Sequence, residues 1–359
     1  SLVGSEMCIR DSLQYAKEHF GPTDRKCLYV NMNNFYFQSR GIADFAGDFV
    51  RHGGRTLLID QVFKQSDWSK ELRKCYDLYP ELRIVFTGSS VMRLKEENPE
   101  LNGIVKSYNL RGFSFREFIN LQTGNSFKPY TLDEILRNHE HIIKQILPKV
   151  SPMKYFQDYL HHGFYPFFLE NRNFTENLLK TMNMTTEVDI LLIKQIELKY
   201  LTKIKRLFYQ LAVEGAKAPN VSQLAEEINT SRATVMNYIK YLADARLINM
   251  IYPTGQEFPK KPSKVMMHNS NLMYAIYPIK IDKQEVMETF FVNSVWKDHK
   301  VSQTGKDHYF IVDGEKKFRI CDAQSPNKVR NNPDIIYARY NTEVGKDNRI
   351  PLWLLGFLY

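Results

Sequence analysis

The stretch Leu57-Leu58-Ile59-Asp60-Gln61 decides the fold of the first part of the chain. Three bulky apolar residues in a row are typical of a strand that is buried on both faces, and the acid marks the strand's carboxyl end. Residues 82–90 (LRIVFTGSS) form a second apolar run that ends in hydroxyl-bearing residues, and residues 66–79 between the runs have helical spacing. Strands that alternate with helices predict a parallel, doubly wound sheet, with Asp60 and Thr87 at the same edge.

Residues 220–250 contain the clearest local pattern in the second half of the chain. A short helix, a turn at residues 229–231 and a second helix from Arg232 to Ala243 lead into a strand, which is the order of a helix-turn-helix followed by a wing. Ser231 is a natural N-cap for the second helix. The candidate contacts to nucleic acid on that helix are Arg232, Thr234, Asn237 and Lys240.

The charges of this segment do not single out DNA as its partner. The acidic and basic side chains that balance one another are Glu226, Glu227 and Asp244 against Arg232, Lys240 and Arg246. Binding to DNA depends strongly on phosphate contacts by Lys and Arg. The balance therefore favours a structural role or contact with a protein, and DNA binding stays open as the alternative.

The remaining segments predict more helices and a final α+β region. Residues 187–214 have the periodicity of one long helix, and the pattern changes to α+β from residue 263 onward. A hairpin is expected around Asp313-Gly314. The apolar segment 350–359 predicts a buried terminal strand.

Composition narrows the class of protein. The chain has 359 residues, 49 Lys and Arg against 40 Asp and Glu, and a formal net charge of +9, which permits contact with nucleic acid without demonstrating it. No apolar run reaches about 18 residues, so no transmembrane helix is expected. The four cysteines form neither a metal-ligand motif nor a dense disulfide framework. We therefore expect a cytoplasmic protein without a membrane partner.

Residues 1–12 (SLVGSEMCIRDS) match neither a signal peptide nor a targeting segment. They resemble the translation of a sequencing adapter, so we treat them as a non-native segment and leave them out of the fold prediction. On this interpretation the native protein begins further upstream.

Several short motifs together carry a family resemblance. They are Asp60-Gln61, Trp68-Ser69, Tyr76-Asp77, FTGSS at 86–90, GFSFREF at 112–118, YPFF at 165–168, NSNLMYA at 269–275 and IPLW at 350–353. With these motifs, residues 13–359 closely resemble the bacterial and archaeal AAA-like P-loop ATPases that carry a winged helix and a C-terminal nuclease-like domain of unknown function.

The resemblance implies an α/β fold, in which a truncated P-loop NTPase-type parallel sheet precedes a helical and winged-helix region and an α+β, restriction-endonuclease-like domain. It implies ATP and Mg²⁺ as cofactors, with Asp60 on Mg²⁺ and Thr87 near the γ-phosphate. It also implies a homo-oligomer and a DNA or protein partner for the winged helix. The expected segments are 1–12 (non-native), 13–125 (ATPase core), 126–219 (helical lid), 220–262 (winged helix) and 263–359 (nuclease-like).

Three departures from the family pattern bear on ATP. No G-x-x-x-x-G-K-[ST] motif occurs in the sequence, so tight binding of ATP is not expected. Gln61 stands where the family has a Glu that polarises the attacking water, and Gln cannot accept a proton, although it orients water in some GTPases. Gly103 and Ile104 stand where the family has paired arginines. Deficient hydrolysis is the expectation, and enzymatic activity is left open.

The C-terminal region departs from the family in the same direction. A nuclease of this class needs clustered carboxylates and a Lys around its metal. Glu288 is kept, but Tyr309 stands at the expected Asp and Arg319 at the expected Glu. The resemblance therefore implies a degenerate nuclease site, and an active nuclease is the least favoured reading.

Together these patterns predict a truncated, hydrolysis-deficient protein of the ATPase family. The alternative is a DNA- or protein-binding regulatory module, in which the winged helix binds the partner and the ATPase half is a scaffold.

Overall fold

The computed structural model describes residues 14, 18–20, 24–88, 98–108, 110–170, 173–304, 309–324 and 332–359. The segment 1–12 and the end of the FTGSS motif lie outside these residues. The chain forms two compact units, which consist of residues 1–111 with 184–198 and of residues 112–183 with 199–359. Each unit is described by itself below.

The first unit is built on three parallel strands in the order β1-β2-β3. Their register places Asn31 beside Asp60 and Ile59 beside Phe86, so the three strands end at one level. The elements of this unit are β1 (Cys27–Asn31), η1 (Phe35–Gln38), α2 (Ile42–Arg51), β2 (Thr56–Asp60), η2 (Val62–Lys64), α3 (Trp68–Leu78), β3 (Arg83–Phe86), η4 (Pro99–Leu101), η7 (Thr185–Ile190) and α8 (Leu191–Ile193).

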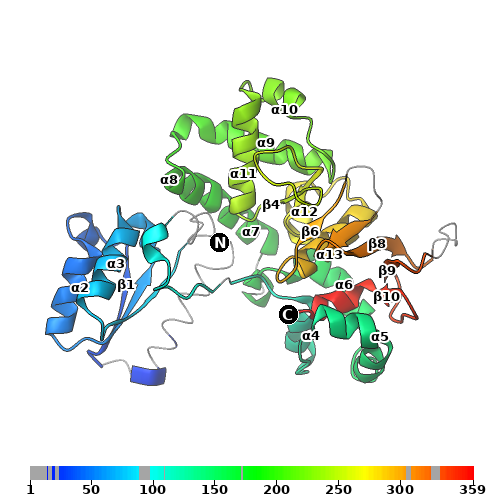
Figure 1. The fold of residues 1–359 in the computed structure, drawn as a ribbon, viewed down its shortest axis with the longest axis horizontal. Coiled ribbons are helices and arrows are strands. Elements are labelled where there is room, and N and C mark those ends of the chain that lie inside the picture. Colours follow the sequence, from blue (N-terminus) through cyan, green and yellow to red (C-terminus); the bar gives the residue numbers. More distant parts are fainter. Residues whose placement is uncertain are drawn as a thin grey trace. The chain divides into compact units, whose positions relative to one another are not determined.

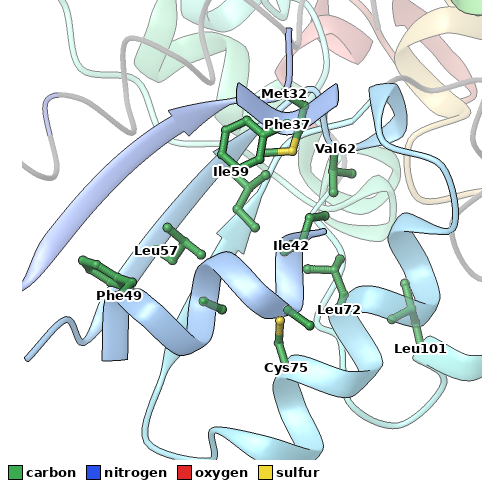
Figure 2. Close-up of a cluster of buried hydrophobic side chains, with 12 residues drawn as sticks. Met32, Phe37, Ile42, Phe49, Leu57, Ile59, Val62, Leu72, Cys75 and Leu101 are labelled. Carbon is green, nitrogen blue, oxygen red and sulfur yellow. The ribbon is translucent and has the colours of Figure 1, made fainter. Parts of the chain in front are cut away.

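Helices α2 and α3 cover one face of this sheet. Figure 2 shows Leu57 and Ile59 of β2 directed toward Ile42 of α2 and Leu72 of α3, and all four side chains are buried. Burying one such side chain stabilises a fold by about 1.5–3 kcal/mol. The apolar side chains of the two helices therefore attach them to this face of the sheet.

The second compact unit begins at Gly112, with the GFSFREF motif. Ser114 caps α4 (Phe115–Thr123) in a reciprocal capping box with Glu117. Nε of Arg116 donates to the carbonyl oxygen of Tyr359 at 2.9 Å. The rings of Phe115 and Phe357 are 6.4 Å apart. These contacts hold α4 to the end of the chain.

Three helices and an antiparallel strand pair follow in the middle of this unit: α9 (Leu201–Glu214), α10 (Val221–Glu227), α11 (Arg232–Asp244), β4 (Ile248–Ile251) and β5 (Lys264–Met267) (Figure 1). The predicted cap is confirmed, because Ser231 Oγ accepts from the backbone N–H of Thr234 at 3.1 Å. The predicted order of two short helices and a strand is present in the structure.

The C-terminal sheet has five strands in the order β10-β9-β8-β7-β6. The three strands β6, β7 and β8 pair antiparallel, and β8, β9 and β10 pair parallel. One face packs on helix α13 (Lys283–Val295), where the rings of Phe291 and Phe318 are 5.2 Å apart. The remaining elements of this unit are α5 (Leu132–Ile146), α6 (Met153–Asp158), η5 (Tyr159–Gly163), η6 (Pro166–Glu170), α7 (Phe174–Met184), α12 (Ser270–Ile276), β6 (Val301–Ser302), β7 (Phe310–Val312), β8 (Lys316–Asp322), β9 (Ile335–Tyr340), β10 (Arg349–Pro351) and η9 (Leu352–Phe357), and η8 (Leu198–Tyr200) spans the border of the two units.

Two expected elements differ from the structure. The single helix expected at 187–214 is broken, because Gln195 has a φ of +51° and α9 begins only at Leu201. The expected terminal strand is short, since β10 ends at Pro351 and the next six residues form the 3₁₀ helix η9. All six are buried, so an apolar run without alternation cannot distinguish a strand from a buried helical turn.

No helix in the described part of the chain is both long and apolar enough to cross a membrane.

Cys75 of α3 provides a test of the first core. It is fully buried, and this burial raises the pKa of its thiol from 9.0 to about 12. The thiol therefore stays protonated in the folded unit, while the unfolded chain loses the proton above pH 9. The contribution of the protonated thiol to the free energy of unfolding is fully present below pH 9. It is lost as the pH rises toward 12, by at most about 1.4 kcal/mol per pH unit.

We expect the free energy of unfolding of the wild type to fall by about 2 kcal/mol more than that of Cys75→Val between pH 8 and pH 10.5. Urea unfolding followed by Trp68 fluorescence measures both values, because Trp68 lies in the same unit. An equal fall in the two proteins would show that Cys75 ionises normally in the folded state.

Candidate functional site

The carboxylate of Asp60 lies at the carboxyl end of β2 and accepts three hydrogen bonds. Its Oδ1 accepts from Oγ1 of Thr87 at 2.5 Å. Its Oδ2 accepts from Nδ2 of Asn31 at 2.7 Å and from the hydroxyl of Tyr29 at 3.1 Å. Asp60 is only 1% exposed, and a buried carboxylate is tolerated when such donors replace water.

The aligned strand ends bring these groups together. Asn31 is the register partner of Asp60, and Tyr29 lies two residues earlier on the same face of β1. The backbone continues the pairing past β3, because the N–H of Thr87 donates to the carbonyl of Ile59 at 2.8 Å. The predicted meeting of Asp60 and Thr87 at one edge is therefore present in the structure.

Gln61 turns the chain away from the sheet directly after Asp60. It has a φ of +53°, in the left-handed region, and its N–H donates to Oγ1 of Thr87 at 3.0 Å. Its side-chain oxygen accepts from Nδ2 of Asn33 at 2.9 Å. Thr87 thus uses one hydroxyl both to donate to Asp60 and to accept from Gln61.

Tyr29 serves this cluster as a hydrogen-bond donor. Burial raises the pKa of its phenol above 10.0, and the negative charge of Asp60 raises it further, against the opposing effect of the hydrogen bond from Asn31. The hydroxyl therefore keeps its proton over the physiological range. Tyr29 and Asn31 were not predicted from the sequence. Asn31 could have been predicted by assuming that β1 and β2 end at the same level, because it then lies beside Asp60.

The cluster fits one part of a magnesium–nucleotide site. Mg²⁺ is usually bound by one or two carboxylates together with phosphate oxygens and water, and Asp60 supplies one carboxylate beside the hydroxyl of Thr87. The donors that would bind the phosphates are missing, because the sequence holds no glycine-rich loop with its Lys. Among the described residues, no three His, Cys, Asp or Glu side chains gather to hold a metal by themselves.

The two positions expected for arginines lie directly after η4. Gly103 has a φ of +78° and open space around its Cα, and Ile104 packs partly against the first core. Neither residue offers a positive charge to a phosphate.

The four candidate residues on α11 differ in their surroundings. Arg232 and Asn237 are exposed, and Thr234 is partly covered near the Ser231 cap. Nζ of Lys240 is 2.5 Å from Oδ1 of Asp244, one helical turn later on α11. Lys240 is therefore neutralised within the helix, and Arg232 is the more available cation.

The three residues of the expected nuclease site do not form one site. Glu288 of α13 accepts from Nζ of Lys264 at 2.8 Å and from Nε2 of Gln284 at 3.1 Å. Arg319 follows Phe318 on β8, and the ring of Phe318 packs toward α13. Consecutive side chains of a strand point to opposite faces, so Arg319 lies on the face away from α13. Tyr309 lies with its ring 5.5 Å from Nζ of Lys317.

Comparison with known proteins matches two regions of the chain. Residues 12–119 match the family model described as an AAA domain, and residues 153–283 match a domain of unknown function, DUF8612. The three-stranded parallel sheet with its helices is compatible with an AAA P-loop-type fold.

Two curated archaeal proteins are similar to part of the chain. The uncharacterized protein MJ1637 of Methanocaldococcus jannaschii is 27% identical over 205 residues, and the uncharacterized protein MJ1544 of the same organism is 23% identical over 209 residues. Each match covers 55% of this chain and 43% of the relative. The chain therefore corresponds to less than half the length of these relatives.

The hydroxyl of Thr87 should be worth about 1–3 kcal/mol to the first unit, because its loss leaves a buried carboxylate one donor short. We expect Thr87→Val to lower the free energy of unfolding by that amount in urea titrations followed by Trp68 fluorescence. Thr56→Val is the matched control, since Thr56 is buried in β2 and its hydroxyl has no hydrogen-bond partner among the described residues. Equal losses in both variants would assign the effect to packing.

Proposed function

We propose that residues 24–108 form the Mg²⁺-facing part of an AAA-type, nucleotide-responsive module that hydrolyses ATP poorly or not at all. The observation that carries the proposal is the hydrogen bond from Thr87 to Asp60 across the aligned ends of β2 and β3. Open parallel sheets bind their ligands at this edge. The match of residues 12–119 to an AAA domain supports the same assignment.

Each residue of the cluster has a separate task in this proposal. Asp60 holds a negative charge at the place where Mg²⁺ would bring the phosphates, and Asn31 and Tyr29 keep the carboxylate oriented. Thr87 lies beside it, where its hydroxyl can respond to a γ-phosphate. ATP with Mg²⁺ would supply the reactive phosphoryl group.

The poor hydrolysis follows from Gln61. Its amide can orient a water molecule, but it cannot take up the proton that the water must lose. In addition, the amide oxygen is already engaged with Asn33. The absence of positive charge at Gly103 and Ile104 removes a second source of transition-state stabilisation.

We assign the partner-binding role of the module to the segment 220–262, as a winged helix. The exposed Arg232 and Asn237 at the start of α11 support a partner that touches this helix. The ion pair of Lys240 with Asp244 leaves little net positive charge, which favours a protein over DNA. The regulatory-module alternative shares this segment and differs only in needing no nucleotide.

Binding of ATP to the 359-residue chain tests the proposal. We expect Mg²⁺-dependent quenching of Trp68 fluorescence with a dissociation constant on the order of 1 mM, weak because the glycine-rich loop is missing from the sequence. Trp68 is a suitable reporter, since its ring is 6.1 Å from Phe86, the residue before Thr87. Asp60→Asn should remove the dependence on Mg²⁺, while Thr56→Val should keep it.

Phosphate release should stay at the background of the protein-free assay. Turnover on the order of 1 per second, which is ordinary for enzymes, would contradict the role assigned to Gln61. Quenching that is the same with and without Mg²⁺ would contradict the role assigned to Asp60 and favour the regulatory-module alternative.

A further inference from the structure

The C-terminal sheet has a second face that α13 does not cover. Phe318 and Ile320 of β8 are buried on the α13 side, so the alternate residues Lys317, Arg319 and Cys321 lie on the other side. The neighbouring strands β9 and β10 lie beside β8 (Figure 1). Their register continues this outer face across three parallel strands.

Four cations gather on the outer face, and we call them the basic face: Lys317 and Arg319 of β8, Arg339 of β9 and Arg349 of β10. Tyr337 is the register partner of both Arg319 and Arg349. The two arginines therefore flank one tyrosine, about 10 Å apart, which is two strand spacings. Cys321 is the register partner of Arg339.

No carboxylate neutralises these cations within the described residues. The described positions that share the face are Ile335, Tyr337, Cys321 and Pro351, and none is acidic. Lys317 contacts the ring of Tyr309, and Arg339 donates to the carbonyl oxygen of Ala323. The guanidinium groups of Arg319 and Arg349 make neither a hydrogen bond nor an ion pair with the described part of the chain.

The same positive charges affect the pKa of the Cys321 thiol. Burial raises its pKa, the positive charges of Arg339, Arg319 and Arg349 oppose that rise, and the negative charge of Asp322 adds a smaller contribution to it. Three guanidinium groups thus act together on one partly buried thiol. Cations gathered on one face create a positive potential that attracts an anion.

We propose that the basic face binds the phosphodiester backbone of a single-stranded nucleic acid. Arginine presents a planar fork that matches two phosphate oxygens, and three of the four cations are arginines. The described residues of this face include no helix that could enter a duplex groove, whereas a single strand can lie across it. The proposal needs neither ATP nor the segment 220–262.

An acidic protein is the competing partner. The arginine fork matches carboxylates as well as phosphates, so the choice depends on how the charges are distributed. Four cations spread over three neighbouring strands suit a repeating polyanion better than a single acidic side chain. The net charge of +9 also favours attraction of a nucleic acid strand over most proteins.

The test is the salt dependence of binding to a fluorescent oligothymidine of roughly 20 nucleotides. The wild type should bind with an anisotropy change that weakens between about 50 and 200 mM salt. Arg319→Gln with Arg349→Gln should lower the affinity roughly tenfold and reduce the slope of log K against log salt by about 1.4, which is 0.7 for each lost phosphate contact. Neither guanidinium group pairs with a described residue, so the fold should be kept.

The matched control is Lys144→Gln with Lys154→Gln, which removes the same charge from exposed lysines of α5 and α6 whose side chains make no ion pair with a described residue. It should leave the slope within about 0.3 of the wild type. As an independent readout, photocrosslinking of a bromouracil-containing strand should label peptides of β8, β9 and β10.

Four results would overturn the proposal. The first is no binding of the oligonucleotide by the wild type, and the second is an equal loss of affinity in the lysine control. The third is a loss of affinity in Arg232→Ala with Asn237→Ala but not in the basic-face variant. The fourth is binding of polyglutamate without binding of the oligonucleotide. The third result would move the site to α11, and the fourth would identify an acidic protein as the partner.

Discussion

The equal register of three parallel strands is the constraint on which the first unit depends. Because β1, β2 and β3 end at one level, Asn31 and Thr87 can both reach the buried carboxylate of Asp60. A slip of one residue in either neighbour would turn its polar side chain to the opposite face and leave the charge short of donors. A single acid with 1% exposure therefore helps to select one pairing of the sheet.

Much of this arrangement could be predicted from the sequence, because apolar runs that end in Asp60 and Thr87 show both the strands and their common edge. The hydrogen-bond donors of β1, Tyr29 and Asn31, could not be predicted, because a Tyr and an Asn in a short strand look like surface residues until the register is known. The break near Gln195 escaped prediction for another reason: periodicity reports which face is apolar and carries no information on a single left-handed residue. The roles assigned to α11 stay predictions.

The C-terminal sheet keeps Glu288 and Arg319 apart. A metal centre needs carboxylates that converge, but Glu288 is held by Lys264 on one face and Arg319 lies on the other. Arg319 lies with three other cations on the outer face, where no described strand residue is acidic. Electrostatically, this face would attract an anion rather than a cation.

The contact of Arg116 with Tyr359 joins residues 243 positions apart in the sequence. In a chain made from its N-terminus, β1, β2 and β3 can pair as soon as residue 86 has left the ribosome. By contrast, α4 has to wait for η9, and in the meantime the ring of Phe115 lacks its neighbour Phe357. Such long-range closure slows folding and exposes apolar surface during synthesis. The second unit therefore completes the packing around α4 only after η9 has been made.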